Sequence, residues 1–193
     1  MKSLILDGRS ELDNSEIQKL HDIILKELKK NQCYVNDIPL REKNIAPCQG
    51  CFDCWVKTPG ICKIDDYGRI IAEQIVKSDL VIHLTPITFG GYSSELKKAM
   101  DRTISLVLPF FKVVDGEIHH KQRYSTHPCL IVIGYQNSPH LEFEETFHTL
   151  VHRNVLNMEA AFYKSLVVNN KQDLSKFQAD FQNCLEEVKY HNK

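Results

Sequence analysis

The sequence has no long apolar run and no excess of charge of either sign. Its 193 residues carry 24 Lys and Arg against 25 Asp and Glu, a formal charge of −1 at pH 7. That balance, with no long run of Lys and Arg, argues against a nucleic-acid-binding surface. No apolar run approaches the roughly 18 residues that a membrane-spanning helix needs. We therefore expect a chain that binds neither nucleic acid nor membrane.

We expect no signal peptide, and the sequence shows no internal repeat or low-complexity tract. A first apolar run, residues 4–6, already ends at Asp7, too early for a signal peptide. We predict a cytoplasmic protein with a single domain over residues 1–193, because this length suffices for one hydrophobic core. Seven cysteines are many for such a chain. Without a secretory signal, clustered cysteines favour metal, cluster or redox chemistry over a disulfide framework.

Apolar runs alternate with segments of helical spacing along the chain. Three runs are nearly continuous, which is typical of parallel strands buried on both faces. The alternation predicts a doubly wound three-layer α/β domain. We expect it to resemble a flavodoxin-like sandwich, in which five parallel strands have the order 2-1-3-4-5. Residues 108–127 lack a period and are predicted to be irregular, with a turn at 113–117. We expect strands at 2–7, 33–38, 79–85, 128–134 and 160–168, and helices from Ser15, at 65–77, 94–107 and 139–154, and from Leu174.

The stretch at residues 84–100 (LTPITFGGYSSELKKAM) has the pattern of a strand end, a glycine-containing loop and a helix start. In an open α/β sheet, ligands bind at the carboxyl ends of such strands. The pair Gly90–Gly91 lets the backbone approach a flat ligand, and the N–H groups that begin the next helix hold an anion or a carbonyl oxygen. The alternative is an ordinary surface loop.

Two further loops are expected beside this stretch. The loop after the first strand has Arg9, Ser10, Asn14 and Ser15 before a helix, an arrangement that suits a phosphate. A plain N-cap with solvated neighbours is the alternative. The other loop, residues 134–138, follows the fourth predicted strand.

Four of the cysteines are clustered in a connection without periodicity, residues 40–64. Long ordered connections tend to be functional. Four thiolates can hold a [4Fe–4S] cluster, whereas structural zinc sites usually have two separated cysteine pairs. Thiols that pack in the loop without metal are the third possibility, and the residues leave all three open. The pattern C-x2-C-x2-C-x7-C is formed by Cys48, Cys51, Cys54 and Cys62.

The sequence resembles the NADPH-dependent FMN reductase-like and iron–sulfur flavoproteins of the flavodoxin superfamily. The resemblance runs from residue 1 to about residue 134 and is strongest over 47–66 (PCQGCFDCWVKTPGICKIDD) and 85–102 (TPITFGGYSSELKKAMDR). It implies an FMN-binding protein that moves electrons, usually as a homodimer or homotetramer. The loop after the third strand would run along the isoalloxazine ring, and the loop after the first would hold the phosphate. The cofactor-binding residues expected on this basis are Arg9, Ser10, Asn14, Ser15, Pro86, Ile87, Thr88, Phe89, Gly90, Gly91, Tyr92, Gly134 and Tyr135.

The first loop departs from the family's pattern of Gly-Ser-Pro-Arg followed by Ser/Gly-Asn-Thr. This chain has GRSELDNS over residues 8–15, one residue shorter, with Asn14–Ser15 in the Asn-Thr place. Glu11 and Asp13 put negative charge close to the expected phosphate. Two like charges 4 Å apart repel by roughly 4 kcal/mol at an effective dielectric constant of about 20.

Three functions are therefore open. The first is an FMN-dependent oxidoreductase that passes electrons from NAD(P)H to a small-molecule acceptor such as a flavin or quinone. FMN carries the chemistry, so no catalytic side chain is required. The second is an electron carrier with FMN and a [4Fe–4S] cluster, fed by a ferredoxin-like partner. The third is a binding or sensor module without FMN.

Overall fold

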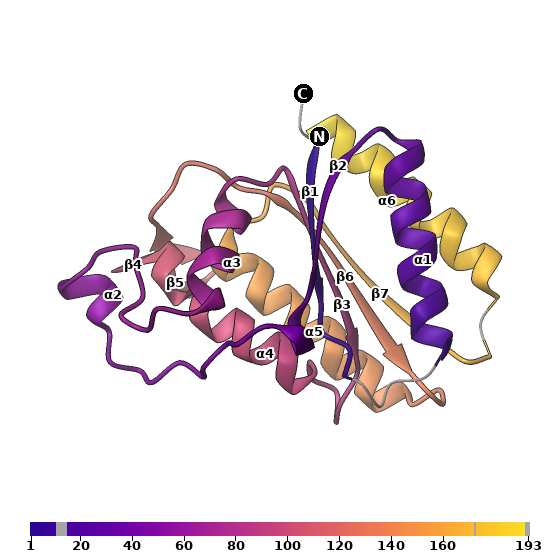
Figure 1. The fold of residues 1–193 in the computed structure, drawn as a ribbon, viewed down its shortest axis with the longest axis horizontal. Coiled ribbons are helices and arrows are strands. Elements are labelled where there is room, and N and C mark those ends of the chain that lie inside the picture. Colours follow the sequence, from indigo (N-terminus) through magenta and orange to yellow (C-terminus); the bar gives the residue numbers. More distant parts are fainter. Residues whose placement is uncertain (11–14, 172, 192–193) are drawn as a thin grey trace.

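The computed structural model describes residues 1–10, 15–171 and 173–191. Its central sheet has five parallel strands in the order β2-β1-β3-β6-β7 (Figure 1). The numbers differ from the predicted order 2-1-3-4-5 because two strands of a separate hairpin, β4 and β5, precede β6 in the chain. The sheet strands are β1 (Lys2–Asp7), β2 (Tyr34–Pro39), β3 (Leu80–Pro86), β6 (Cys129–Gln136) and β7 (Tyr163–Asn169).

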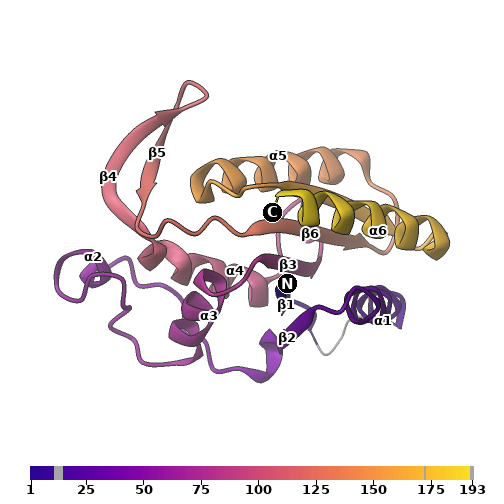
Figure 2. The same ribbon diagram turned by 90° about the horizontal axis from the view of Figure 1, so that it is seen from above.

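Helices cover both faces of this sheet (Figures 1 and 2). One face is covered by α1 (Ser15–Lys30) and α6 (Leu174–His191). The other is covered by α3 (Tyr67–Val76), α4 (Ser94–Asp101) and α5 (Leu141–Met158). An apolar core fills the space on each side, which gives a three-layer α/β arrangement. Within the described residues, we find no helix with both the length and the apolar character needed to cross a bilayer.

The burial of the strands follows the sequence pattern. In β1, β3 and β6 nearly every residue is buried, as expected for central strands with helices on both faces. The edge strands β2 and β7 are largely half-exposed. The five predicted strands agree with the observed ones to within three residues at each end.

The prediction of an irregular segment at 108–127 is wrong. The chain there forms an antiparallel hairpin, β4 (Val107–Val114) and β5 (Glu117–Gln122), which projects away from the three layers (Figure 2). Its turn is Asp115–Gly116, with φ of 50° and 80°. The turn at 113–117 was expected, but the two strands on either side of it were not, although an Asp-Gly pair between apolar residues is a strong hairpin signal.

The predicted helix at 94–107 is also too long. The α-helix α4 ends at Asp101, and the chain continues as a 3₁₀ segment, η2 (Arg102–Leu106), into the hairpin. Carbonyl groups at a helix end need donors from elsewhere. Trp55 Nε1 supplies one, donating to the carbonyls of Ile104 at 3.1 Å and Val107 at 3.0 Å. A contact between residues so distant in the sequence has no local signature.

Candidate functional site

The carboxyl ends of β1 and β3 lie side by side, since Asp7 pairs with Leu84 in the sheet. The loops that follow them are joined at Gly8. Its N–H donates to the Leu84 carbonyl at 2.7 Å, and its carbonyl accepts a hydrogen bond from Ser93 Oγ at 2.6 Å. A β-carbon at Gly8 would lie 2.8 Å from Leu96 Cβ, so a larger residue would displace α4. The first loop and the start of α4 therefore form one fixed unit.

Arg9, a predicted phosphate ligand, is buried and forms an ion pair with the carboxylate of Asp7. Its Nε and Nη2 donate to the two oxygens of Asp7 at 2.7 and 2.6 Å, and its backbone N–H donates to Asp7 Oδ1 at 3.1 Å. Arg9 Nη1 donates to Gln18 Oε1, and Arg41 Nη1 also reaches Asp7, at 3.1 Å. Burial would raise the pKa of Asp7, but the hydrogen bonds and charge of Arg9 hold it below its ordinary value. With Nε and Nη2 bound to Asp7 and Nη1 to Gln18, Arg9 keeps one further N–H on each of its two terminal nitrogens for a phosphate.

The rest of the predicted phosphate loop is described only in part. Ser10 and Ser15 are exposed at its two described ends. Asn14 lies outside the described residues, as do Glu11 and Asp13. The assignment of these residues to a phosphate stays a prediction.

The loop after β3 forms a tight, paired turn at the carboxyl edge. Thr88 and Gly91 exchange backbone hydrogen bonds of 3.0 and 2.9 Å. Between them, Phe89 and Gly90 take positive φ values of 48° and 78°. For an aromatic residue this conformation is strained, and such strain is concentrated at functional sites. The turn holds the Phe89 ring out from the protein, with 85% of the residue exposed.

The remaining residues of this loop have packing contacts. Ile87 N donates to the Tyr135 carbonyl at 2.7 Å, which ties the loop to β6. Pro86 ends β3 and is half-buried, like Ile87. Tyr92 is buried; its hydroxyl accepts a hydrogen bond from Asn154 at 3.0 Å, and burial raises its pKa to about 12.

Gly134 and Tyr135, from the end of β6, are also packed in the interior. A β-carbon at Gly134 would lie 2.8 Å from Ile87 and from the Phe147 ring. Tyr135 is 4% exposed and belongs to the core under α1 and α6. Gly134 and Tyr135 support the carboxyl edge of the sheet from the interior. Their direct contact with a cofactor stays a prediction.

Two residues at this edge, His140 and Phe143, were missed by sequence reasoning, and a third, Gln136, was expected only as part of the loop 134–138. Gln136 is buried at the end of β6; its Oε1 accepts from His140 N at 3.2 Å, while its Nε2 has no hydrogen-bond partner in the described part of the chain. The rings of His140 and Phe143 stack with centroids 3.8 Å apart, and Phe89 lies edge-on to Phe143 at 6.3 Å. Gln136 is adjacent to a predicted residue, which was the available signal. The aromatic grouping depends on the packing of α5 and has no local signal.

The four cysteines of the C-x2-C-x2-C-x7-C pattern line one small cavity of about 20 Å³. They belong to the cysteine loop, residues 46–66, which includes the short helix α2 (Asp53–Val56). All seven cysteines of the chain are free thiols. Burial raises the pKa of Cys54, and the neighbouring Cys62, Cys48 and Cys51 raise it further. The cavity wall also includes Arg102.

Within the described residues, no three His, Cys, Asp or Glu side chains converge on a position for one metal ion. This finding weighs against a zinc site, in which four ligands surround one ion at about 2.0–2.3 Å. In a [4Fe–4S] cluster each thiolate binds a different iron, so the ligand sulfurs stand farther apart. The number and type of the thiols fit such a cluster, although a cavity of this size would have to widen to enclose it.

A buried ion pair lies behind the thiols. Asp66 Oδ2 accepts from Arg102 Nη1 at 2.8 Å, and Asp66 also accepts the backbone N–H groups of Ala46 and Gly68. Burial would raise the pKa of Asp66, but these hydrogen bonds lower it. Burial would likewise lower the pKa of Arg102, but the Asp66 carboxylate and the Cys62 thiol raise it. Both groups are therefore charged.

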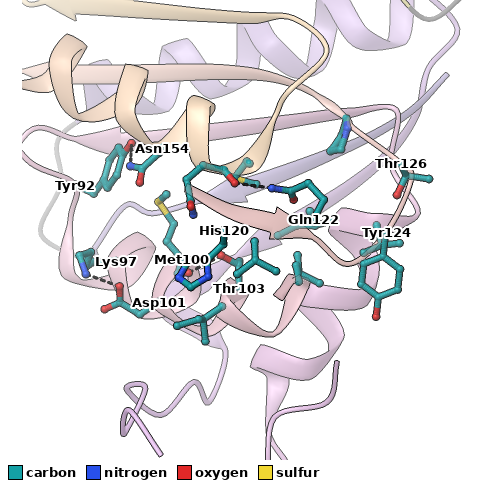
Figure 3. Close-up of a pocket in the computed structure, with 18 of the residues that line it drawn as sticks. Tyr92, Lys97, Met100, Asp101, Thr103, His120, Gln122, Tyr124, Thr126 and Asn154 are labelled. Carbon is teal, nitrogen blue, oxygen red and sulfur yellow. Dashed lines mark hydrogen bonds and ion pairs between the residues drawn. The ribbon is translucent and has the colours of Figure 1, made fainter. Parts of the chain in front are cut away.

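A separate cavity of about 280 Å³ lies between α4, the hairpin and the carboxyl-terminal half of α5 (Figure 3). Its polar side chains are largely paired with one another or with backbone. Lys97 pairs with Asp101, and Gln122 donates to the Asn157 carbonyl. Tyr92 is a member of the predicted flavin set that lines it. Because most of the wall is far from the carboxyl ends of β1 and β3, we do not assign the flavin to this cavity.

Comparison with known proteins adds a family and a fold. Residues 1–162 match the family model described as NADPH-dependent FMN reductase. An iron–sulfur flavoprotein of Methanocaldococcus jannaschii is 38% identical over 73 residues, which is 38% of this chain and 37% of that protein. The aligned part spans less than half the length of the curated relatives that the chain matches.

Two solved structures share the fold at low identity. The NAD(P)H:quinone oxidoreductase from Methanothermobacter marburgensis has a TM-score of 0.65 at 11% identity, covering 99% of this chain and 95% of that one. An FMN-dependent NADH-azoreductase from Bacillus anthracis, in complex with FMN, has a TM-score of 0.63 at 14% identity, with 97% of each chain covered.

Proposed function

The chain belongs to the NADPH-dependent FMN reductase family of oxidoreductases, and from this premise we propose that it binds FMN at the carboxyl edge of the sheet. With NAD(P)H as donor, it would reduce a small-molecule acceptor such as a flavin or quinone. The observation that carries this proposal is the paired turn at Thr88–Gly91, which lies at the edge where an α/β sheet binds its ligands. Bound FMN supplies the electron-transfer chemistry, and the protein supplies position and electrostatics.

The turn after β3 is suited to a flat ring. Its two backbone hydrogen bonds fix its shape in advance, so little ordering cost remains when a ligand binds. Phe89 is held outward and Phe143 lies beside it, and aromatic pairs contribute about 0.5–1.5 kcal/mol beyond burial. Backbone N–H groups near Phe89–Tyr92 would stabilise negative charge that develops on the ring.

The loop expected to hold the FMN phosphate is less favourable for binding than the turn after β3. Asp7 faces two guanidinium groups, those of Arg9 and Arg41, so this trio carries one net positive charge. A phosphate at the first loop would be attracted by that charge, but Arg9 is already held by Asp7. We expect the ring, rather than the phosphate, to supply most of the FMN affinity.

The test of this function is direct. Protein purified without added flavin is titrated with FMN, and binding is followed by the visible spectrum and by quenching of flavin fluorescence. The loaded protein should then oxidise NAD(P)H when a quinone or free flavin is present. A protein that neither retains nor takes up FMN would overturn the proposal and favour a binding module without flavin.

The cysteine loop supports a second candidate function, an electron carrier that holds a [4Fe–4S] cluster besides FMN and receives electrons from a ferredoxin-like partner. The supporting observation is that Cys48, Cys51, Cys54 and Cys62 line one cavity, and a cluster of this kind takes four thiolate ligands. Cys51 is exposed, so the loop has an open side from which to widen. Anaerobic purification with analysis of iron and acid-labile sulfide separates this function from the first.

We also propose that the chain assembles as a homodimer or homotetramer. The hairpin leaves large apolar side chains in solvent, with Phe110, Phe111, Val113 and Ile118 between 60% and 75% exposed. A two-stranded hairpin is marginal by itself, and contiguous exposed apolar residues mark association surfaces.

A further inference from the structure

One arginine closes the cysteine loop from inside the protein. Arg102, the first residue of η2, is 2% exposed. Its Nη1 donates to the Ala46 carbonyl at 2.9 Å, two residues before Cys48. Its Nη2 donates to the Ile64 carbonyl at 3.0 Å, two residues after Cys62. A single guanidinium therefore holds together both ends of the segment that carries the four thiols.

The same guanidinium has donors left over. Among the described residues, Arg102 Nε is buried and has no hydrogen-bond partner; Nη1 uses both of its N–H groups, whereas Nη2 uses one of its two, on the Ile64 carbonyl. A buried donor without an acceptor is costly and calls for an explanation. Arg102 lines the cavity shared by the four cysteines, and Cys62 lies next to the guanidinium. A sulfur in this cavity would supply the acceptor that this donor lacks.

We propose that Arg102 is a positioning residue for an iron–sulfur cluster in the cysteine loop: it closes the loop and directs a cationic N–H donor at the sulfurs. This inference rests on the second candidate function. One-electron reduction adds negative charge to a cluster without breaking a bond. A cationic donor at the sulfurs stabilises the reduced form more than the oxidised form, because reduction potentials of clusters rise with hydrogen bonds to sulfur and with positive charge.

The chain offers a matched control in Arg69. This arginine also anchors the cysteine loop, with Nε donating to the Cys62 carbonyl at 2.8 Å and Nη2 to the Lys63 carbonyl at 3.2 Å. However, Arg69 does not line the cavity of the four thiols. If both arginines only anchored the backbone, substituting either one would have a similar effect on the reduction potential. A role at the sulfurs would make the effect specific to Arg102.

The experiment compares the wild-type protein, Arg102→Lys and Arg69→Lys, two variants that each keep the positive charge, all reconstituted anaerobically with iron and sulfide. Lysine keeps a cation beside Asp66, which avoids an unpaired buried carboxylate, but it lacks the Nε donor. Folding is checked by circular dichroism, and iron and sulfide are counted per chain. The midpoint potential is then measured by dithionite titration followed by electron paramagnetic resonance, a readout that does not depend on enzyme activity.

We expect the wild-type protein and Arg69→Lys to hold about four iron ions per chain at the same potential. Arg102→Lys should have a more negative potential. If folded Arg102→Lys takes up no cluster, retention in Arg69→Lys still supports the proposal, and loss in both overturns it. Equal potentials in all three proteins, or equal shifts in both variants, overturn the role of Arg102 but leave the iron–sulfur function. A wild-type protein that takes up no cluster overturns both.

Discussion

Gly90 packs directly against Thr146 of α5: a β-carbon at Gly90 would lie 2.8 Å from Thr146 Cβ. The contact joins the exposed turn after β3 to the helix that carries His140 and Phe143 on its first turn and cap. The turn is therefore fixed from two sides, by its own backbone pairing and by α5.

This contact gives the first prediction. Gly90→Ala should weaken FMN binding at least tenfold, because the added methyl group clashes with Thr146 and the residue must keep a φ of 78°. Gly116→Ala is the matched control: Gly116 has a φ of 80° in the hairpin turn, but a β-carbon there meets nothing within 4 Å. FMN titration of both variants measures the difference. Equal losses of FMN affinity in the two variants would show that backbone strain, and not the position of the turn after β3, governs binding.

The second prediction concerns Asp7. Asp7→Asn removes a negative charge from the first loop and loosens its hold on Arg9. We expect the affinity for FMN to rise relative to that for riboflavin, which lacks the phosphate. The variant should lose about 1–3 kcal/mol of unfolding free energy, because the charged hydrogen bonds become neutral ones. Calorimetric titration with both ligands and urea unfolding test this; an unchanged ratio of affinities would place the phosphate elsewhere.

The sequence was sufficient to predict the three layers because buried strands and helices have recognisable apolar patterns. Nearly continuous apolar runs such as Leu80–Leu84 belong to strands covered on both faces, and their alternation with helices fixes the fold class. The hairpin was missed because β4 contains Pro109 and β5 is almost wholly polar, so neither strand shows the alternation of a half-buried strand.

The site was predictable only where its parts are close in the sequence. The turn around Gly90 and the four clustered thiols were both identified from local patterns. By contrast, Arg102 and Asp66 are 36 residues apart, and their pairing depends on how η2 packs on the cysteine loop. Arg9 and Asp7 are close in the sequence. The geometry of their ion pair nevertheless depends on burial, which sequence spacing does not reveal.

The third prediction uses His83, which is buried in the middle of β3 and whose Nδ1 has no hydrogen-bond partner among the described residues. Burial lowers its pKa from 6.5 to about 4. Between these values the unfolded chain binds more protons than the folded one, so stability falls as the pH drops. The loss should reach about 3 kcal/mol once the pH is below both values. Urea unfolding of wild-type protein and His83→Leu between pH 7 and 4 measures it, and parallel pH profiles would contradict it.

The fourth prediction concerns the exposed face of the hairpin. Val113 and Ile118 pair across the two strands, and they are 71% and 75% exposed. If they meet a second copy, burying each contributes about 1.5–3 kcal/mol, so Val113→Lys with Ile118→Lys should dissociate the assembly. The stability of the separated chain should hardly change, because both side chains already face solvent. Tyr190→Lys is the control, since Tyr190 is 73% exposed on α6, away from the hairpin (Figure 1). Sedimentation velocity of the three proteins decides: dissociation by the hairpin variant alone places the interface there, and an unchanged mass rules that out.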